Sequence, residues 1–386
     1  MTTATLEKKV PAAATPANLE RPAEAPPARR PGDRKRIIAG FDLGTNASCV
    51  VAGPADNRDI TVSKIVPSVV GYAREGLVDG IIAGNATLLI GEEALNHRLQ
   101  LRMIAPLEDG IIAHRDAARD LIQRIRAVID PSGAAEVRVV IGVPANAGEP
   151  AREDIRACAT GVFDRVLLIP EPFLAALGFR DDARLGQPNY VDPVTNSLFV
   201  DIGGGTSDLC LIQGYFPTRE DQISLPFAGD AIDKIIEDEL QRIYPNNGLS
   251  RATIRQIKEE HSYVGAVRKP IDVKVLIGGK SHTLELGEII GRACNRLIEK
   301  IYPALTALIA RASSDSVAQL LQNIVVTGGG SRIRGIDLVL QEKLAADGFE
   351  APKVRLAGQD FKRYVAVGAL KAARAAREDQ WQHLLA

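Results

Sequence analysis

Residues 197–208 read Ser-Leu-Phe-Val-Asp-Ile-Gly-Gly-Gly-Thr-Ser-Asp and continue as Leu-Cys-Leu-Ile at 209–212. An apolar run that ends in an acid, followed by a glycine-rich turn and a second apolar run, predicts a β-hairpin. The glycines leave backbone N–H groups exposed at the tip, and such groups bind phosphate. We therefore expect phosphate oxygens to contact Gly203, Gly204, Gly205 and Thr206, with Asp201 beside them.

The same pattern occurs 159 residues earlier. A strand over 36–42 ends in Asp42, and Gly44, Thr45 and Asn46 form the turn before a returning strand over 47–52. One Asp-x-Gly-Thr turn is more often an ordinary turn than a ligand site. Two such turns predict two related lobes that each offer a hairpin to a shared cleft. In that cleft Asp42 and Asp201 are placed to hold the water shell of Mg²⁺ while the tips bind a nucleotide.

A third glycine-rich turn follows an apolar strand near the C-terminus. The strand is predicted over 323–326, the turn contains Gly328, Gly329, Gly330 and Ser331, and a helix is predicted over 336–346. This turn strengthens the prediction of a nucleotide clamp.

The rest of the chain alternates between strand and helix patterns, which predicts α/β lobes with covered sheets. Strands are expected over 137–142 and 165–168, helices over 149–160 and 172–178, and a hairpin over 271–286. A length of 386 residues also exceeds what one compact core usually holds.

Glu171 lies between Pro170 and Pro172, which fix the backbone on both sides. A carboxylate presented in this way is able to orient the water that attacks a γ-phosphate, and Thr206 is able to hold the same water or the phosphate. The alternative is that Glu171 is only the first residue of a helix, where its negative charge interacts favourably with the helix dipole. Both interpretations stay open at this point.

Composition excludes several other classes of protein. The chain has 47 Lys and Arg against 48 Asp and Glu, so no net field attracts nucleic acid or an anionic membrane. Residues 1–36 contain six prolines and few aliphatic side chains, which predicts a disordered, solvated extension and no membrane-inserting helix. No apolar run approaches the length of a membrane span, so we expect a cytoplasmic protein.

Other catalytic motifs are absent from the sequence. The Gly279-Lys280-Ser281 run lacks the earlier glycine of a P-loop, because position 274 is Lys274. The five histidines and four cysteines have no zinc-ligand spacing, and no serine lies in a Gly-x-Ser-x-Gly elbow.

The ordered motifs resemble those of the actin, heat-shock-70 and sugar-kinase ATPase superfamily. Residues 42–46 resemble its first phosphate loop, 201–206 its second, and 327–331 its adenosine loop; 142–145 and 365–369 resemble the segments that connect the lobes. Glu171-Pro172 with 175–178 is similar to the bacterial actins, and 321–335 is most similar to their magnetosome branch. The likeness covers residues 37–370.

This resemblance implies an actin-like two-lobed fold with four subdomains, ATP or ADP and Mg²⁺ in the cleft, and ATP-dependent filaments whose hydrolysis promotes disassembly. It places lobe I at 37–195 with a small subdomain at 66–103, and lobe II at 196–386 with a small subdomain at 230–286. It also favours a nucleoside contact for Lys258 and Glu259, which otherwise suit a solvated helix face. The implied partners are further copies of the chain, with adaptor proteins of an organelle or membrane, and the implied cargo is the magnetosome.

Three other functions compete with this one. A rod-shape or plasmid-segregating actin would share the chemistry and differ in its cargo. A chaperone of the heat-shock-70 type would need a peptide-binding domain, and only 16 residues follow Leu370. A sugar kinase would need an acidic base towards the sugar, for which the sequence offers no candidate.

Overall fold

Two sheets repeat one strand arrangement within residues 35–386, which form a single compact unit. The first has the order β18-β10-β9-β1-β2-β3 and the second the order β13-β12-β11-β16-β17. In each sheet, two strands form an antiparallel hairpin and a third strand pairs antiparallel with the second strand of that hairpin. On the other side, two more strands continue the sheet, and they run parallel to the first strand of the hairpin. The duplication predicted from the two Asp-ended hairpins is therefore present in the strand topology.

The computed structural model describes residues 34–145, 147–188, 190–245, 247–266 and 270–383. The predicted extension at 1–36 lies almost wholly outside the described residues. Within them, no helix is both long enough and apolar enough to cross a bilayer.

The first sheet and its surroundings contain the following elements. The strands of the sheet are β1 (Arg36–Asp42), β2 (Ala47–Pro54), β3 (Val62–Pro67), β9 (Glu136–Val143), β10 (Arg165–Pro170) and β18 (Gln382–His383). Smaller strands are β4 (Val70–Ala73), β5 (Leu88–Ile90), β6 (Leu101–Ile104), β7 (Leu107–Glu108) and β8 (Ile111–Ile112). The helices are α1 (Glu92–Asn96), α2 (Arg115–Ile129), α3 (Glu149–Ala159), α4 (Glu171–Phe179) and α10 (Phe361–Ala375), with 3₁₀ turns at Ala83–Asn85 and Glu378–Gln380.

The second sheet has a matching set. Its strands are β11 (Ser197–Ile202), β12 (Ser207–Ile212), β13 (Gln222–Leu225), β16 (Ile324–Thr327) and β17 (Val354–Leu356), and β14 (Asp272–Ile277) with β15 (Lys280–Glu285) forms a separate hairpin. The helices are α5 (Gly229–Ile243), α6 (Arg251–His261), α7 (Gly287–Ile309), α8 (Val317–Leu321) and α9 (Ile336–Ala346), with 3₁₀ turns at Asp182–Arg184, Arg219–Asp221 and Gly329–Arg332.

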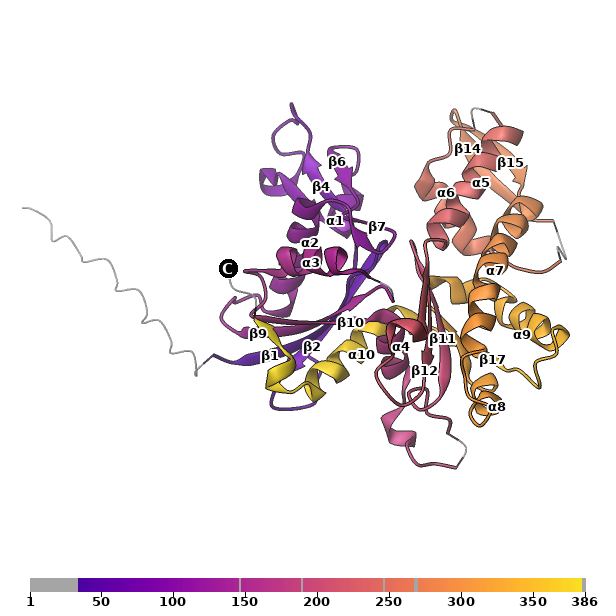
Figure 1. The fold of residues 1–386 in the computed structure, drawn as a ribbon. Helices are drawn as coiled ribbons and strands as arrows, with labels where there is room; N and C mark the ends of the chain where they lie inside the picture. The colour runs from indigo at the N-terminus through magenta and orange to yellow at the C-terminus, as the bar shows by residue number, and fades with distance from the viewer. Residues whose placement is uncertain (1–33, 146, 189, 246, 267–269, 384–386) are drawn as a thin grey trace, which may run out of the picture. The chain divides into compact units, whose positions relative to one another are not determined.

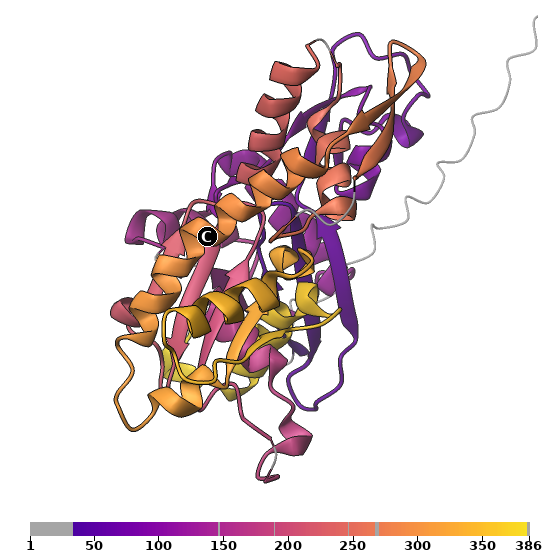
Figure 2. The same ribbon diagram turned by 90° about the vertical axis from the view of Figure 1, so that its right-hand side faces the viewer.

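The central strands are apolar on both faces because helices cover both faces of each sheet. One face of the first sheet packs Phe41 and Val139 against Leu121 and Ile125 of α2. One face of the second packs Val200 and its neighbours against α7, which runs from the β14–β15 hairpin towards the sheet (Figure 2).

Helices α4 and α10 lie between the two sheets (Figure 1). One apolar cluster joins Val140 of the first sheet and Phe199 of the second to Leu174 of α4 and Ala366 of α10. The two helices approach closely because Gly368 of α10 lies against the backbone of α4. A Cβ at Gly368 would lie 1.9 Å from the carbonyl oxygen of Leu174. This pair of helices is the structural connection between the sheets.

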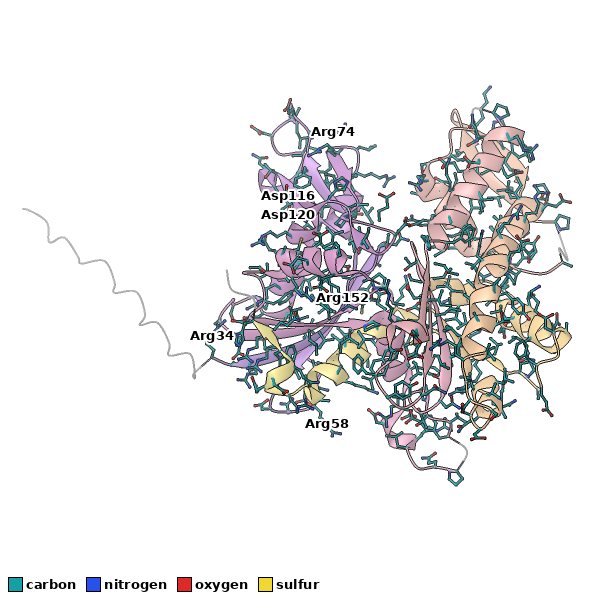
Figure 3. All side chains as sticks on the ribbon, viewed as in Figure 1. Arg34, Arg58, Arg74, Asp116, Asp120 and Arg152 are labelled. Carbon is teal, nitrogen blue, oxygen red and sulfur yellow. The ribbon has the colours of Figure 1, made fainter. Side chains whose placement is uncertain are left out.

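A small sheet of β5, β4 and β6 lies beyond α2. The Tyr72 hydroxyl donates to Asp120 Oδ2 at 2.6 Å and fixes β4 on α2. Figure 3 shows Asp116 and Asp120 one turn apart on α2, below Arg74. This sheet lies inside the predicted small subdomain at 66–103 to within one residue. The β14–β15 hairpin, α5 and α6 coincide with the one predicted at 230–286, again to within one residue. The domain limits themselves stay predictions.

Candidate functional site

The tips of the two repeated hairpins face one hollow of about 510 Å³. Leu43 to Asn46 join β1 to β2, and Gly203 to Thr206 join β11 to β12, where the N–H of Gly203 donates to the Thr206 carbonyl at 2.9 Å. The loop after β16 contributes Gly328, Gly329 and Gly330. The three glycine-rich turns predicted from sequence thus meet at one place.

The tips also contact each other. Asn46 Nδ2 donates to Asp230 Oδ1 at 3.3 Å, and the Asp230 N–H donates to the Gly204 carbonyl at 2.8 Å. A Cβ on Gly204 would lie 2.1 Å from Asn46 Nδ2, so the Asn46 side chain packs directly on this glycine and would have to shift to admit a larger residue. Arg255 Nη2 lies 2.8 Å from Asp230 Oδ1 and holds the carboxylate in place. Sequence analysis identified neither Asp230 nor Arg255.

A fourth turn reaches the site from the short β7–β8 hairpin. The Gly110 N–H donates to Thr45 Oγ1 at 3.1 Å, and a Cβ on Gly205 would lie 2.6 Å from the Asp109 Cα. Asp109 and Gly110 have φ values of 48° and 75°, the geometry for which Asp-Gly is favoured in two-residue hairpins. The Asp-Gly pair itself is the sequence signal that could have found this turn.

Four carboxyl groups lie together in the hollow: Asp42, Glu171, Asp201 and Asp208. Burial, and after it the charges of Asp42 and Asp208, raises the pKa of Asp201 from 3.8 to about 8. Burial also raises the pKa of Asp42 to about 7. Burial, followed by the charges of Asp42, Asp208 and Asp201, raises the pKa of Glu171 well above its usual 4.5. Like charges gathered in this way favour binding of a cation.

Asp208 is a site residue that sequence analysis missed. Its Oδ2 accepts from Thr206 Oγ1 at 2.7 Å, and its Oδ1 accepts from the Ala145 N–H at 3.0 Å. Burial nevertheless raises the pKa of Asp208, although these hydrogen bonds oppose the change. Asp208 fixes the Thr206 hydroxyl at the tip and joins it to the segment after β9.

The other end of the hollow is formed by α6 and by the start of α10. Lys258 and Glu259 both line it. Lys258 Nζ lies 2.8 Å from Asp233 Oδ1 and also donates to the Gly229 carbonyl at 2.8 Å, so its charge is already paired. Further lining residues that the sequence did not reveal are Arg332, Ile333, Gln359, Phe361 and Lys362.

Ser331 differs from the other predicted site residues because it does not line the hollow. Its side chain is buried, and its Oγ donates to the Gly328 carbonyl at 2.7 Å. The adjacent Gly330 packs on Ile202, with 2.2 Å between a Cβ at Gly330 and Ile202 Cγ2. In this structure Ser331 shapes the loop that carries the glycines.

The carboxyl groups fit a hydrated divalent cation better than a directly ligated one. Within the described part of the chain, no three Asp, Glu, His or Cys side chains are arranged as a metal-ligand group. Mg²⁺ commonly keeps several waters and uses one or two carboxylates together with phosphate oxygens. Asp42 and Asp201, at the ends of equivalent strands, suit that role.

Comparison with known proteins gives a consistent result. Residues 36–377 match the family model described as MreB/Mbl protein. Actin-like protein MamK of Magnetospirillum gryphiswaldense is 30% identical over 316 residues, which cover 81% of this chain and 82% of that protein. A structure described as a MamK double helical filament matches with a TM-score of 0.78 and 28% identity, over 89% of this chain and 100% of that one.

A second solved structure is described as a non-polymerising mutant of MamK bound to AMPPNP. It matches with a TM-score of 0.62 and 28% identity, over 88% of this chain and 99% of that one. The predicted actin-like fold and the predicted likeness to bacterial actins are confirmed by these matches.

Proposed function

Because the chain belongs to the MreB/Mbl family of actin-like cytoskeletal proteins, we propose that it binds ATP in the hollow between the two hairpin tips and polymerises into filaments. The observation that carries this proposal is the meeting of two Asp-ended hairpins and a glycine loop around a cluster of four carboxyl groups. The AMPPNP bound to the related MamK structure supports a nucleotide as the ligand.

The roles of the residues follow from their positions. The N–H groups at Gly44 to Asn46 and at Gly203 to Thr206 would bind phosphate oxygens, as exposed backbone amides do in other phosphate sites. Asp42 and Asp201 would hold Mg²⁺ through water, and the ion would neutralise charge on the phosphates. Gly328 to Gly330, Lys258 and Glu259 would contact the nucleoside.

We assign hydrolysis of ATP to the same hollow. Glu171 begins α4 between two prolines and faces Asp42, Asp201 and Asp208. A carboxyl group whose pKa is raised above its usual value is suited to orient a water and accept its proton. Thr206, held by Asp208, would position the same water or the terminal phosphate.

Polymerisation would use further copies of this chain as partners. The filament described for the related MamK structure supports self-association. An open filament needs two different surfaces that meet head to tail, because such a contact does not close on itself. We propose that ATP-bound subunits assemble and that hydrolysis promotes disassembly.

The cargo of the filament is a separate step of the proposal. The likeness to MamK supports a cytoplasmic filament that aligns or positions magnetosomes, with adaptor proteins on the organelle. The alternative is a rod-shape role like that of MreB, which the family model supports equally, or plasmid segregation. A fluorescent fusion that follows the magnetosome chain in cells would support the first, and a pattern along the cell wall would support the second.

A calorimetric titration tests the nucleotide site. We expect saturable binding of ATP with Mg²⁺ to the wild-type protein and binding at least about tenfold weaker for Asp201→Ala, because one group that holds the cation is lost. Asp56→Ala removes an exposed carboxyl group in the loop after β2 and is the matched control. Wild-type affinity in Asp201→Ala would remove this residue from the site.

A further inference from the structure

A second hollow, of about 400 Å³, lies beside the edge strand β17, apart from the nucleotide site. It is lined by the end of α4, by the segment after it and by the start of β17. Three of its lining residues are cations, Arg184, Lys353 and Arg355, and one, Asp181, is acidic. Residues 37–386 carry 39 Lys and Arg against 44 Asp and Glu, so this positive hollow lies on a net negative body.

Local structure brings the cations to one side. Lys353 and Arg355 flank Val354, which is buried, and alternate residues of an extended chain point to the same side. Both side chains therefore lie on the side of the strand opposite to Val354. Arg184 ends the 3₁₀ turn Asp182–Arg184 on the opposite wall, and its guanidinium carbon lies 4.9 Å from the centre of the Tyr190 ring.

Two neighbouring carboxylates, those of Asp192 and Asp182, are already engaged by other cations, and the carboxylate of Asp181 caps a 3₁₀ turn. Asp192 Oδ2 lies 3.3 Å from Nη2 of Arg180. Asp182 Oδ2 lies 3.0 Å from Lys371 Nζ. Asp181 Oδ1 accepts the N–H of Ala183 at 3.1 Å, which caps the 3₁₀ turn.

As a result, Arg184, Lys353 and Arg355 have no ion-pair partner among the residues that the structure describes. Arg355 is the most notable of them. Its Nη2 donates to Asn323 Oδ1, but its Nε is buried without any hydrogen-bond partner in the described chain. Burial also lowers the pKa of Arg355, and no carboxylate opposes this effect. A buried guanidinium N–H without an acceptor is costly, and an anion entering the hollow would satisfy it.

The walls and rim indicate what kind of anion fits. The ring of Phe179 lies 6.0 Å from the Arg355 guanidinium carbon and, with Tyr190, gives the hollow an aromatic wall. Leu185, Val191 and Leu356 are each between 36% and 40% exposed in the same segments. The hollow is much larger than a single inorganic ion, and its apolar rim suits a chain in which acidic and apolar side chains alternate.

We propose that this hollow, defined by Arg184, Lys353, Arg355, Phe179 and Tyr190, binds an acidic peptide segment of a partner protein. Carboxylates of the segment pair with the three cations, and its apolar side chains lie on the rings and the rim. The site is separate from the nucleotide hollow, because the two hollows share no lining residue.

Fluorescence anisotropy with a labelled peptide tests the proposal. The probe alternates glutamate with leucine, its twin carries glutamine in place of each glutamate, and the full-length protein is used without nucleotide. We expect saturable binding of the glutamate peptide, with binding of the glutamine twin at least about tenfold weaker, since each charge-assisted pair is lost.

Variants assign the binding to the hollow. Arg355→Gln should weaken binding about fivefold or more, and Arg184→Gln and Lys353→Gln, which change exposed side chains, about two- to fivefold each. Arg296→Gln on α7 is the matched control, because Arg296 is exposed and Glu299 is its ion-pair partner among the described residues. Unchanged thermal melting of the exposed variants separates loss of binding from loss of fold.

Several outcomes would overturn the proposal. These are no saturable binding by the wild-type protein, equal binding of the two peptides, or variants that match Arg296→Gln. Inorganic phosphate that binds through Arg355 while the glutamate peptide does not would also overturn it, because the hollow would then be a site for a small anion.

Discussion

The raised pKa of Asp201 predicts that the nucleotide-free protein loses stability as pH rises. The pKa is about 8 in the folded chain and 3.8 for an ordinary aspartate. The folded state therefore keeps a proton that the unfolded state releases, and the stability that this proton contributes is lost as pH rises through about 8. Between pH 6 and pH 8 this single group should cost about 2 kcal/mol of unfolding free energy. Asp201→Asn, which never ionises, should not show that loss.

Urea unfolding at pH 6 and pH 8 measures the effect, followed by the fluorescence of Trp381, the only tryptophan of the chain. The difference between the two pH values should be smaller in Asp201→Asn than in the wild type by about 2 kcal/mol. Asp56→Asn, in an exposed loop, should behave like the wild type. Mg²⁺ with ATP should also reduce the change in unfolding free energy between pH 6 and pH 8, because a bound cation favours the ionised carboxylate. An equal pH dependence in Asp201→Asn and wild type would refute the account of the carboxyl cluster.

Three further changes test other parts of the structure. Glu171→Ala should keep ATP binding and lose about 10²-fold in turnover, measured as phosphate release; unchanged turnover would remove Glu171 from the mechanism. Gly368→Ala should destabilise the protein by about 3 kcal/mol in urea unfolding, because its Cβ would meet the Leu174 carbonyl, whereas Gly148→Ala, with only Pro150 Cδ at 3.6 Å, should cost far less. Removal of divalent cations with EDTA should weaken ATP binding about tenfold or more, and equal affinity with and without the chelator would contradict the assigned metal role.

Much of the fold could be predicted because its main signals are local. The strand over 36–42, the helix over 336–346 and the hairpin over 271–286 all occur where the sequence places them, within two residues at their ends. Each is a short run with apolar residues, and a glycine or an acid marks its turn or its end. The sequence pattern of strand, aspartate, glycine-rich turn and strand occurs at Asp42 and again at Asp201. This repeat predicted two sheets of the same topology, with each hairpin at the same place in its sheet.

The rest of the site depends on contacts that no local pattern contains. Asp208 reaches the hollow because it is the second residue of β12 and pairs with Asp201 on β11. Asp230 matters because α5 begins beneath Gly204, and its partner Asn46 is 184 residues away. The β7–β8 turn consists of two-residue strands, which are too short to show a period. Ser331 was predicted to contact the nucleotide because 327–331 resemble an adenosine loop. Its hydroxyl instead donates to the Gly328 carbonyl within the loop, and a sequence pattern does not specify the direction of one side chain.

Sedimentation with negative-stain microscopy tests the central claim most directly. The purified protein is compared with Mg²⁺ and ATP, with Mg²⁺ and ADP, and without nucleotide, next to Glu171→Ala. The account predicts filaments that pellet with ATP, fewer with ADP or no nucleotide, and filaments that persist longer in Glu171→Ala because hydrolysis is slow. A protein that hydrolyses ATP yet stays a soluble monomer in every condition would contradict the account and favour a kinase or a monomeric nucleotide switch.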